Sequence, residues 1–157
     1  MKTESPNFHK FYRWRLYVLS AISVFLGGVI YILLRPTKAV FLNVFNLVGL
    51  DEWADIIREI TVPVSGFFPE WFVYTLPNGL WAFAYALLIF TIWRGSKSLL
   101  KYFWFATIPG LVFGFEMLQF FDVLNGTFAI EDLLSGLVGI IAGILTTKLY
   151  SHETNKV

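Results

Sequence analysis

The chain has no cysteine and few charged residues. Cysteine is absent from all 157 residues, and only 15% of the residues are Asp, Glu, Lys or Arg. Without a thiol the chain forms no disulfide and has neither a cysteine nucleophile nor a cysteine-based zinc site. The two histidines, His9 and His152, lie in the terminal tails. No nucleophile with an adjacent base therefore stands out.

Apolar residues dominate what remains. They make up 57% of the chain, and the mean hydropathy is +0.65, well above the values of soluble domains. Several apolar runs approach the length of about 20 residues that a helix needs to cross a bilayer. We therefore predict an all-α membrane protein that forms a single membrane domain over residues 1–157. Its four transmembrane helices are expected at about 16–34, 76–93, 99–121 and 131–150.

Prolines mark two places along these runs. Pro69 and Pro77 flank an aromatic stretch before the second span, and we expect them to prevent one continuous helix there. Pro109 and Gly110 lie near the middle of the third span, where we expect a kink.

The long first connection is too apolar for a disordered linker, and we expect its segment 40–60 to lie on the membrane surface. Apolar residues recur there with helical spacing, opposite Asp and Glu side chains, which is typical of an amphipathic interfacial helix. The apolar residues are Trp53, Ile56, Ile57 and Ile60. Two roles are open for this segment. It either gates the access of a substrate or forms a lid that only covers helix ends.

Basic residues are unevenly distributed. With four spans, nine of the twelve fall on the side of the termini, which predicts that both termini are cytoplasmic. These nine are Lys2, Lys10, Arg13, Arg15, Arg94, Lys97, Lys101, Lys148 and Lys156. No concentrated basic face of the kind that binds nucleic acid is visible, so we expect the lipid bilayer as the partner and no nucleic acid.

The candidate site is acidic and lies between the last two spans. Carboxylates inside an apolar segment are costly unless they face protein or water. Glu116 and Gln119 share a helix face three residues apart, and Asp132 lies in the first turn of the next helix. The candidate ligand-binding residues here are Glu116, Gln119, Asp122 and Asp132, beside Glu131.

A face of small residues follows Asp132. Ser135, Gly136, Gly139 and Gly143 fall on one side of the fourth span and include a GxxxG pattern. We expect this face to pack against another helix, most plausibly the third span. Such packing brings Asp132 towards Gln119 and Glu116.

A carboxylate cluster of this kind has several uses. It can hold a divalent cation, although no cofactor is evident, and Glu116 with Asp132 can act as acid and base in catalysis. The alternative is structural: Asp132 is then a helix cap, Asp122 and Glu131 are solvated, and Glu116 is satisfied by neighbouring polar groups.

These residues resemble the VanZ-like family of small bacterial membrane proteins. The resemblance covers the last three spans and rests on Tyr85 within GLWAFAYALL, on Glu116-Met-Leu-Gln119, and on Gly126-Thr-Phe followed by Asp132, Gly139 and Gly143. The chain departs from the family pattern in three places: Trp81 stands where a His is common, no Arg follows Gly126, and Gly136 stands where an Asn is usual.

The resemblance implies a bacterial cytoplasmic (inner) membrane protein of the cell envelope, with Trp81 and Tyr85 as further ligand-binding candidates. Three functions stay open. The first is a protein whose outward acidic pocket binds a lipid headgroup, a cation or another membrane protein. The second is an enzyme acting on a lipid-linked envelope substrate, and the third is a small proton-coupled carrier.

Overall fold

The structure is a computed structural model that describes residues 6–35, 49, 51–123 and 128–154. In this part of the chain all regular structure is helical, as predicted. The elements are α1 (Pro6–Leu34), α3 (Asp51–Ser65), the π-helical turn η1 (Trp71–Thr75), α4 (Leu76–Ile92), α5 (Leu100–Phe120) and α6 (Ile130–Thr154).

Four helical segments of the described chain are long and apolar enough to cross a membrane, which confirms the predicted number. This composition indicates a multi-pass membrane protein. Three of the four segments lie within a few residues of the predicted spans, whereas the second begins earlier than residue 76. The segments are Arg13–Leu34, Trp71–Ile92, Leu100–Phe120 and Ile130–Tyr150.

The second span is longer than predicted because the helical backbone passes through Pro77. The Leu76 N–H bonds to the Trp71 carbonyl five residues earlier, which makes Trp71–Thr75 a π-helical turn. A proline ring in an α-helix clashes with the carbonyl four residues before it, which is that of Val73 here. The π turn has a wider backbone than an α-helix. It includes Val73, so it lies at the position where this clash would otherwise occur. A regular α-helix thus begins only at Leu76, with Pro77 in its first turn as expected, while the helical backbone before it continues through the π turn.

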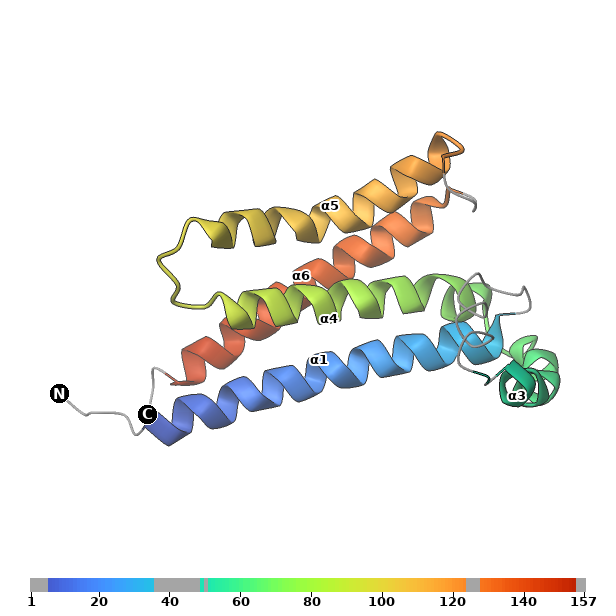
Figure 1. The fold of residues 1–157 in the computed structure, drawn as a ribbon, viewed down its shortest axis with the longest axis horizontal. Helices are drawn as coiled ribbons and strands as arrows, with labels where there is room; N and C mark the ends of the chain where they lie inside the picture. Colours follow the sequence, from blue (N-terminus) through green and yellow to red (C-terminus); the bar gives the residue numbers. More distant parts are fainter. Residues whose placement is uncertain (1–5, 36–48, 50, 124–127, 155–157) are drawn as a thin grey trace.

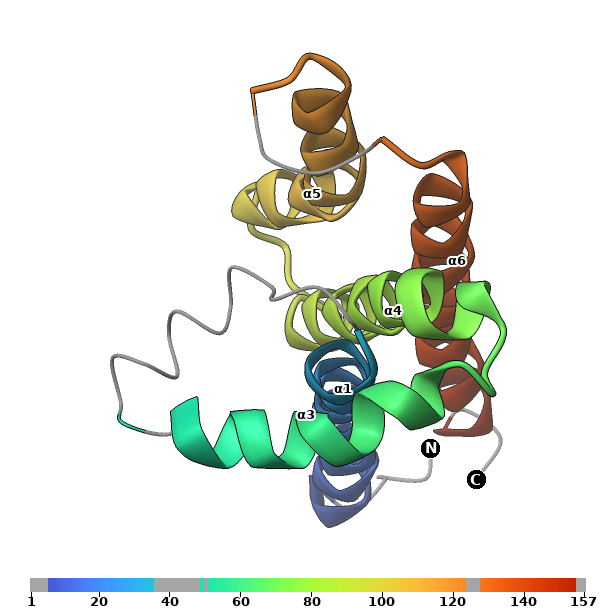
Figure 2. The ribbon, with the colours of Figure 1, turned by 90° about the vertical axis from the view of Figure 1, so that its right-hand side faces the viewer.

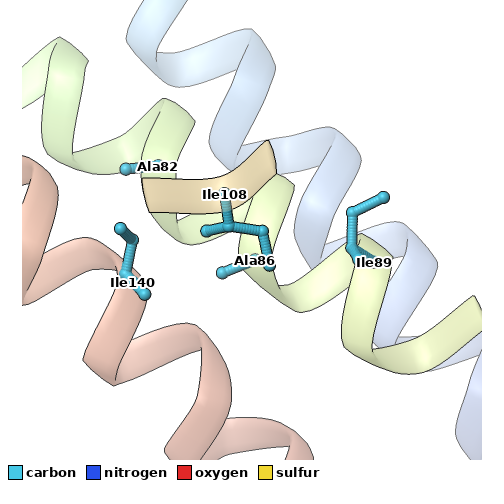
Figure 3. Close-up of a cluster of buried hydrophobic side chains, with 5 residues drawn as sticks. All are labelled: Ala82, Ala86, Ile89, Ile108 and Ile140. Carbon is cyan, nitrogen blue, oxygen red and sulfur yellow. The ribbon is translucent and has the colours of Figure 1, made fainter. Parts of the chain in front are cut away.

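The four spans run alternately up and down, and α4 lies at their centre. Figures 1 and 2 show α1 and α6 on two sides of α4, with α5 farther out. The buried core follows this arrangement, because Ala82, Ala86 and Ile89 of α4 pack with Ile108 of α5 and Ile140 of α6 (Figure 3). α5 also bends along its length (Figure 1), as expected from a helix with Pro109 in its interior.

The small-residue face of α6 packs mainly on α4. A Cβ added at Gly139 would meet the Gly79 carbonyl, and one added at Gly143 would lie 2.8 Å from the Phe83 carbonyl. Such backbone contact is what small residues permit. The expectation that this face packs on the third span is therefore wrong.

Gly136 is the exception in this face. A Cβ added there would meet the side chain of Val112 on α5. α5 thus touches the edge of the small-residue face, while α4 covers its middle.

α3 lies across one end of the bundle. It runs lengthwise in Figure 2, where α1 is seen end-on, and the Thr61 hydroxyl donates to the Leu33 carbonyl at the end of α1, at 2.6 Å. We call this end of the bundle the acidic end. All the described acidic residues except Glu153, in the last turn of α6, lie in the segments that meet there: Asp51, Glu52, Asp55, Glu59, Glu70, Glu116, Asp122, Glu131 and Asp132.

Candidate functional site

Glu116 is buried near the end of α5. Only 7% of its surface is exposed, and its carboxylate accepts a hydrogen bond of 3.2 Å from the backbone N–H of Ala129. Ala129 directly precedes α6, whose first N–H groups have no partner within their own helix. Glu116 therefore fastens the end of α5 to the beginning of α6.

Asp132 lies in the first turn of α6, half-buried. The Asn78 amide and the Thr75 hydroxyl lie near its carboxylate, and the positive charge of Arg35 acts on it as well. The charge of Asp132 also reaches Glu116. Glu116 and Asp132 thus lie at the same end of the bundle, and Glu131 lies on an exposed face.

Arg35 reaches this place from the end of α1. Its guanidinium donates to the Tyr74 carbonyl at 2.8 Å and lies 4.3 Å from the centre of the Tyr31 ring. Stacking of this kind suits the planar guanidinium, which is weakly hydrated. The ring of Tyr74 lies on a second side, 5.4 Å away.

The π-helical turn supplies the carbonyls that hold these side chains. Arg35 binds the carbonyl of Tyr74, and the Ser135 hydroxyl of α6 donates to the next carbonyl, that of Thr75, at 3.1 Å. A π turn changes the register of the backbone hydrogen bonds, which leaves carbonyls available to other elements. The turn therefore joins α1 and α6 at the beginning of α4.

We call Arg35, Thr75, Asn78, Glu116 and Asp132 the polar cluster. The five residues come from the end of α1, the π turn, the beginning of α4, the end of α5 and the beginning of α6. Two carboxylates, one guanidinium, an amide and a hydroxyl can bind a polar group that carries positive charge or several hydroxyls.

Asp122 does not belong to this cluster. It is exposed and ends α5 with a φ of 56°. Its N–H bonds to the Gln119 carbonyl at 3.0 Å, and the N–H of Val123 bonds to the Leu118 carbonyl at 2.9 Å. These two bonds form a Schellman motif, in which Asp122 has the left-handed position. Gln119 itself is half-buried.

Trp81 and Tyr85 point to different neighbours. The Trp81 indole N–H donates to the Val24 carbonyl of α1 at 3.3 Å, and its ring lies 5.3 Å from that of Tyr31. The Tyr85 hydroxyl instead bonds to the hydroxyl of Thr107 on α5, at 2.8 Å. Trp81 therefore adjoins the polar cluster through Tyr31, whereas Tyr85 joins α4 to α5.

No group of three or more Asp, Glu, His or Cys side chains that could hold a metal ion occurs in the described residues. The divalent cation considered from the sequence stays a prediction.

Sequence reasoning missed Arg35, Thr75 and Asn78 as site residues. Arg35 follows the first span directly, and the other two lie where the aromatic stretch continues into the second span. The sequence could have indicated Asn78 as a site residue, because an amide side chain close to an apolar run needs a polar partner.

No protein-family model, no curated protein and no solved structure matches the chain. The resemblance to the VanZ-like family therefore stays a prediction that rests on the motif residues.

Proposed function

We propose that the protein is a VanZ-like integral membrane protein of the bacterial cell envelope that binds a lipid headgroup at its acidic end. The observation that carries this proposal is that two helices place Glu116 and Asp132 at one end of the bundle, with polar side chains from three further elements. Two neighbouring carboxylates repel, so a group with positive charge or hydroxyl donors lowers their energy when it binds between them.

The place of the cluster favours a lipid as the ligand. Its residues lie where α1 and α5 end and where α4 and α6 begin. Helix ends of a membrane protein lie at the depth of the headgroups. A headgroup reaches this cluster without leaving its leaflet, and the exposed Trp71 and the half-buried Tyr31 provide aromatic surface beside it.

The test compares lipids that copurify with the full-length protein. Glu116→Gln with Asp132→Asn keeps the shape of both side chains and removes both charges. We expect one lipid class that the unchanged protein retains to be lost from this variant, as measured by mass spectrometry. Asp55→Asn is the control, since Asp55 is an exposed carboxylate on α3. Retention of the same lipids by all three proteins, each equally folded, would refute the proposal.

A membrane enzyme is the second candidate. The pairing of a buried Glu116 with a half-buried Asp132 favours it, because two carboxylates in unlike surroundings can serve as general acid and base. In that case the Glu116→Gln variant still retains the lipid, while cells that express it accumulate the unreacted substrate. A lipidomic comparison of these cells with cells that carry the unchanged protein separates the two candidates.

We also propose that α3 lies in the membrane interface. The side chains of Ile56, Ile60 and Val64 are exposed at four-residue spacing, and the exposed Asp55 and Glu59 lie on another side of α3. A spin label at Ile60→Cys should be accessible to oxygen dissolved in the lipid. A spin label at Glu59→Cys should instead be relaxed more strongly by collisions with a water-soluble nickel complex. Equal accessibility of both labels would contradict an interfacial helix.

A further inference from the structure

The end of the bundle opposite the acidic end carries mainly basic charge in its described segments. The beginning of α1, the connection between α4 and α5, and the last turns of α6 lie at this end (Figure 1). Within residues 13–20, 92–103 and 144–150 there is no Asp or Glu, whereas Glu153 lies in the last turn of α6. We call this the basic end, and its described basic residues are Lys10, Arg13, Arg15, Arg94, Lys97, Lys101 and Lys148.

The connection between α4 and α5 is held by its own hydrogen bonds. The N–H of Ser98 donates to the Ser96 hydroxyl, and the N–H of Leu100 donates to the Ser98 hydroxyl, both at 3.2 Å. The Lys101 ammonium donates to the Ser96 carbonyl at 3.1 Å. This short ordered connection presents the exposed side chains of Arg94 and Lys97.

Helix packing adds a basic residue of α1 to the same surface. The Arg13 guanidinium lies 3.5 Å from the Thr91 carbonyl near the end of α4. Arg13 is therefore a neighbour of the connection that carries Arg94, although about eighty positions separate the two residues in the sequence.

Large apolar side chains adjoin the basic residues and are themselves exposed. The exposed fraction is 81% for Leu99, 60% for Tyr102 and 61% for Phe103. A free phosphate or a nucleic acid would leave these side chains without a partner. An amphiphile covers both kinds of surface, because its headgroup meets the basic residues while its acyl chains lie along α5.

We propose that the basic end is a binding site for anionic phospholipids. The phosphate, whose negative charge is not offset by a headgroup ammonium, contacts Arg94 and Lys97, with Arg13 beside them, and the acyl chains cover Leu99 and Phe103. Each basic residue near an anionic membrane surface raises the association by about fivefold. Two exposed residues on one connection are therefore enough for a measurable preference among lipids.

The test measures lipid association with the full-length protein in phosphatidylcholine vesicles. Spin-labelled phosphatidylglycerol or spin-labelled phosphatidylcholine is added in trace amounts, and the motionally restricted fraction gives the relative association constant. We expect phosphatidylglycerol to associate about threefold to tenfold more strongly than phosphatidylcholine. The preference should fall towards one in about 0.5 M sodium chloride, where the Debye length is shorter.

Two double variants show whether the connection is responsible. Arg94→Gln with Lys97→Gln should remove most of the preference, whereas Arg94→Lys with Lys97→Arg keeps both charges and should keep it. Inorganic phosphate at matched ionic strength should not compete more than chloride does. Equal association of both lipids with the unchanged protein would overturn the proposal. So would a preference that the neutral variant retains in full, or one that inorganic phosphate abolishes.

Discussion

At the scale of a single residue, Asp122 is a candidate ligand whose role proves to be structural. It was a candidate ligand, yet its φ of 56° and the two hydrogen bonds around it make it the left-handed residue that ends α5. Asp tolerates this conformation better than most residues because its short polar side chain bonds locally. The carboxylate thus has an explanation that needs no ligand.

We expect substitutions at Asp122 to follow backbone preference rather than charge. Asp122→Gly should raise the free energy of unfolding by about 1 kcal/mol, because glycine adopts positive φ without steric cost. Asp122→Val should lower it by about the same amount or more, since a β-branched residue resists this conformation. Thermal unfolding in detergent, followed by circular dichroism, measures both changes. A lower stability for the Gly variant than for the Val variant would contradict the Schellman assignment.

The sequence identified part of the polar cluster and left part of it out, for a physical reason. Glu116 and Asp132 were predictable because a carboxylate in an apolar run is costly wherever the helix packs. Arg35 and Thr75 carry no such signal, since a residue beyond the end of a span can remain in water. Their role depends on which helices meet, and periodicity within one helix says nothing about its neighbour.

At the scale of elements, the small-residue face of α6 was predicted correctly and its partner was not. A GxxxG pattern indicates close approach but does not identify the helix that approaches. Gly79, Ala82 and Ala86 of α4 form a complementary face, spaced three and four residues apart. When two helices each carry a face of small residues, the pair indicates which helices pack together better than one such face does.

We expect two glycines in this molecule to respond oppositely to alanine. Gly139→Ala should lower the free energy of unfolding by about 2 kcal/mol, because the new methyl group collides with the backbone of α4. Gly114→Ala should raise it by about 0.5 to 1 kcal/mol, since a methyl group there has nothing within 4 Å and alanine favours the helix. Unfolding in mixed micelles with increasing dodecyl sulfate gives both values. A Gly139→Ala variant as stable as the parent would mean that α6 packs elsewhere.

At the scale of the whole molecule, charge divides the bundle into two ends. Most of the described acidic residues gather where α3 crosses the bundle, and seven described basic residues lie with Glu153 in the segments at the opposite end. The two proposed lipid sites therefore differ in sign, because the carboxylates suit a headgroup with positive charge or hydroxyls and the basic residues suit an anionic one. Lipids of the two leaflets would meet different ends of the same protein.

The same division predicts the orientation in the membrane. Segments rich in Lys and Arg stay in the cytoplasm, so the basic end should face inward and both termini with it. The absence of native cysteine makes single-cysteine labelling free of background. Glu70→Cys, exposed at the acidic end, should react with a membrane-impermeant maleimide on intact cells. Ser98→Cys, exposed in the connection at the basic end, should react only after the membrane is opened. Labelling of Ser98→Cys but not Glu70→Cys on intact cells would reverse the orientation, and it would place the polar cluster on the cytoplasmic side.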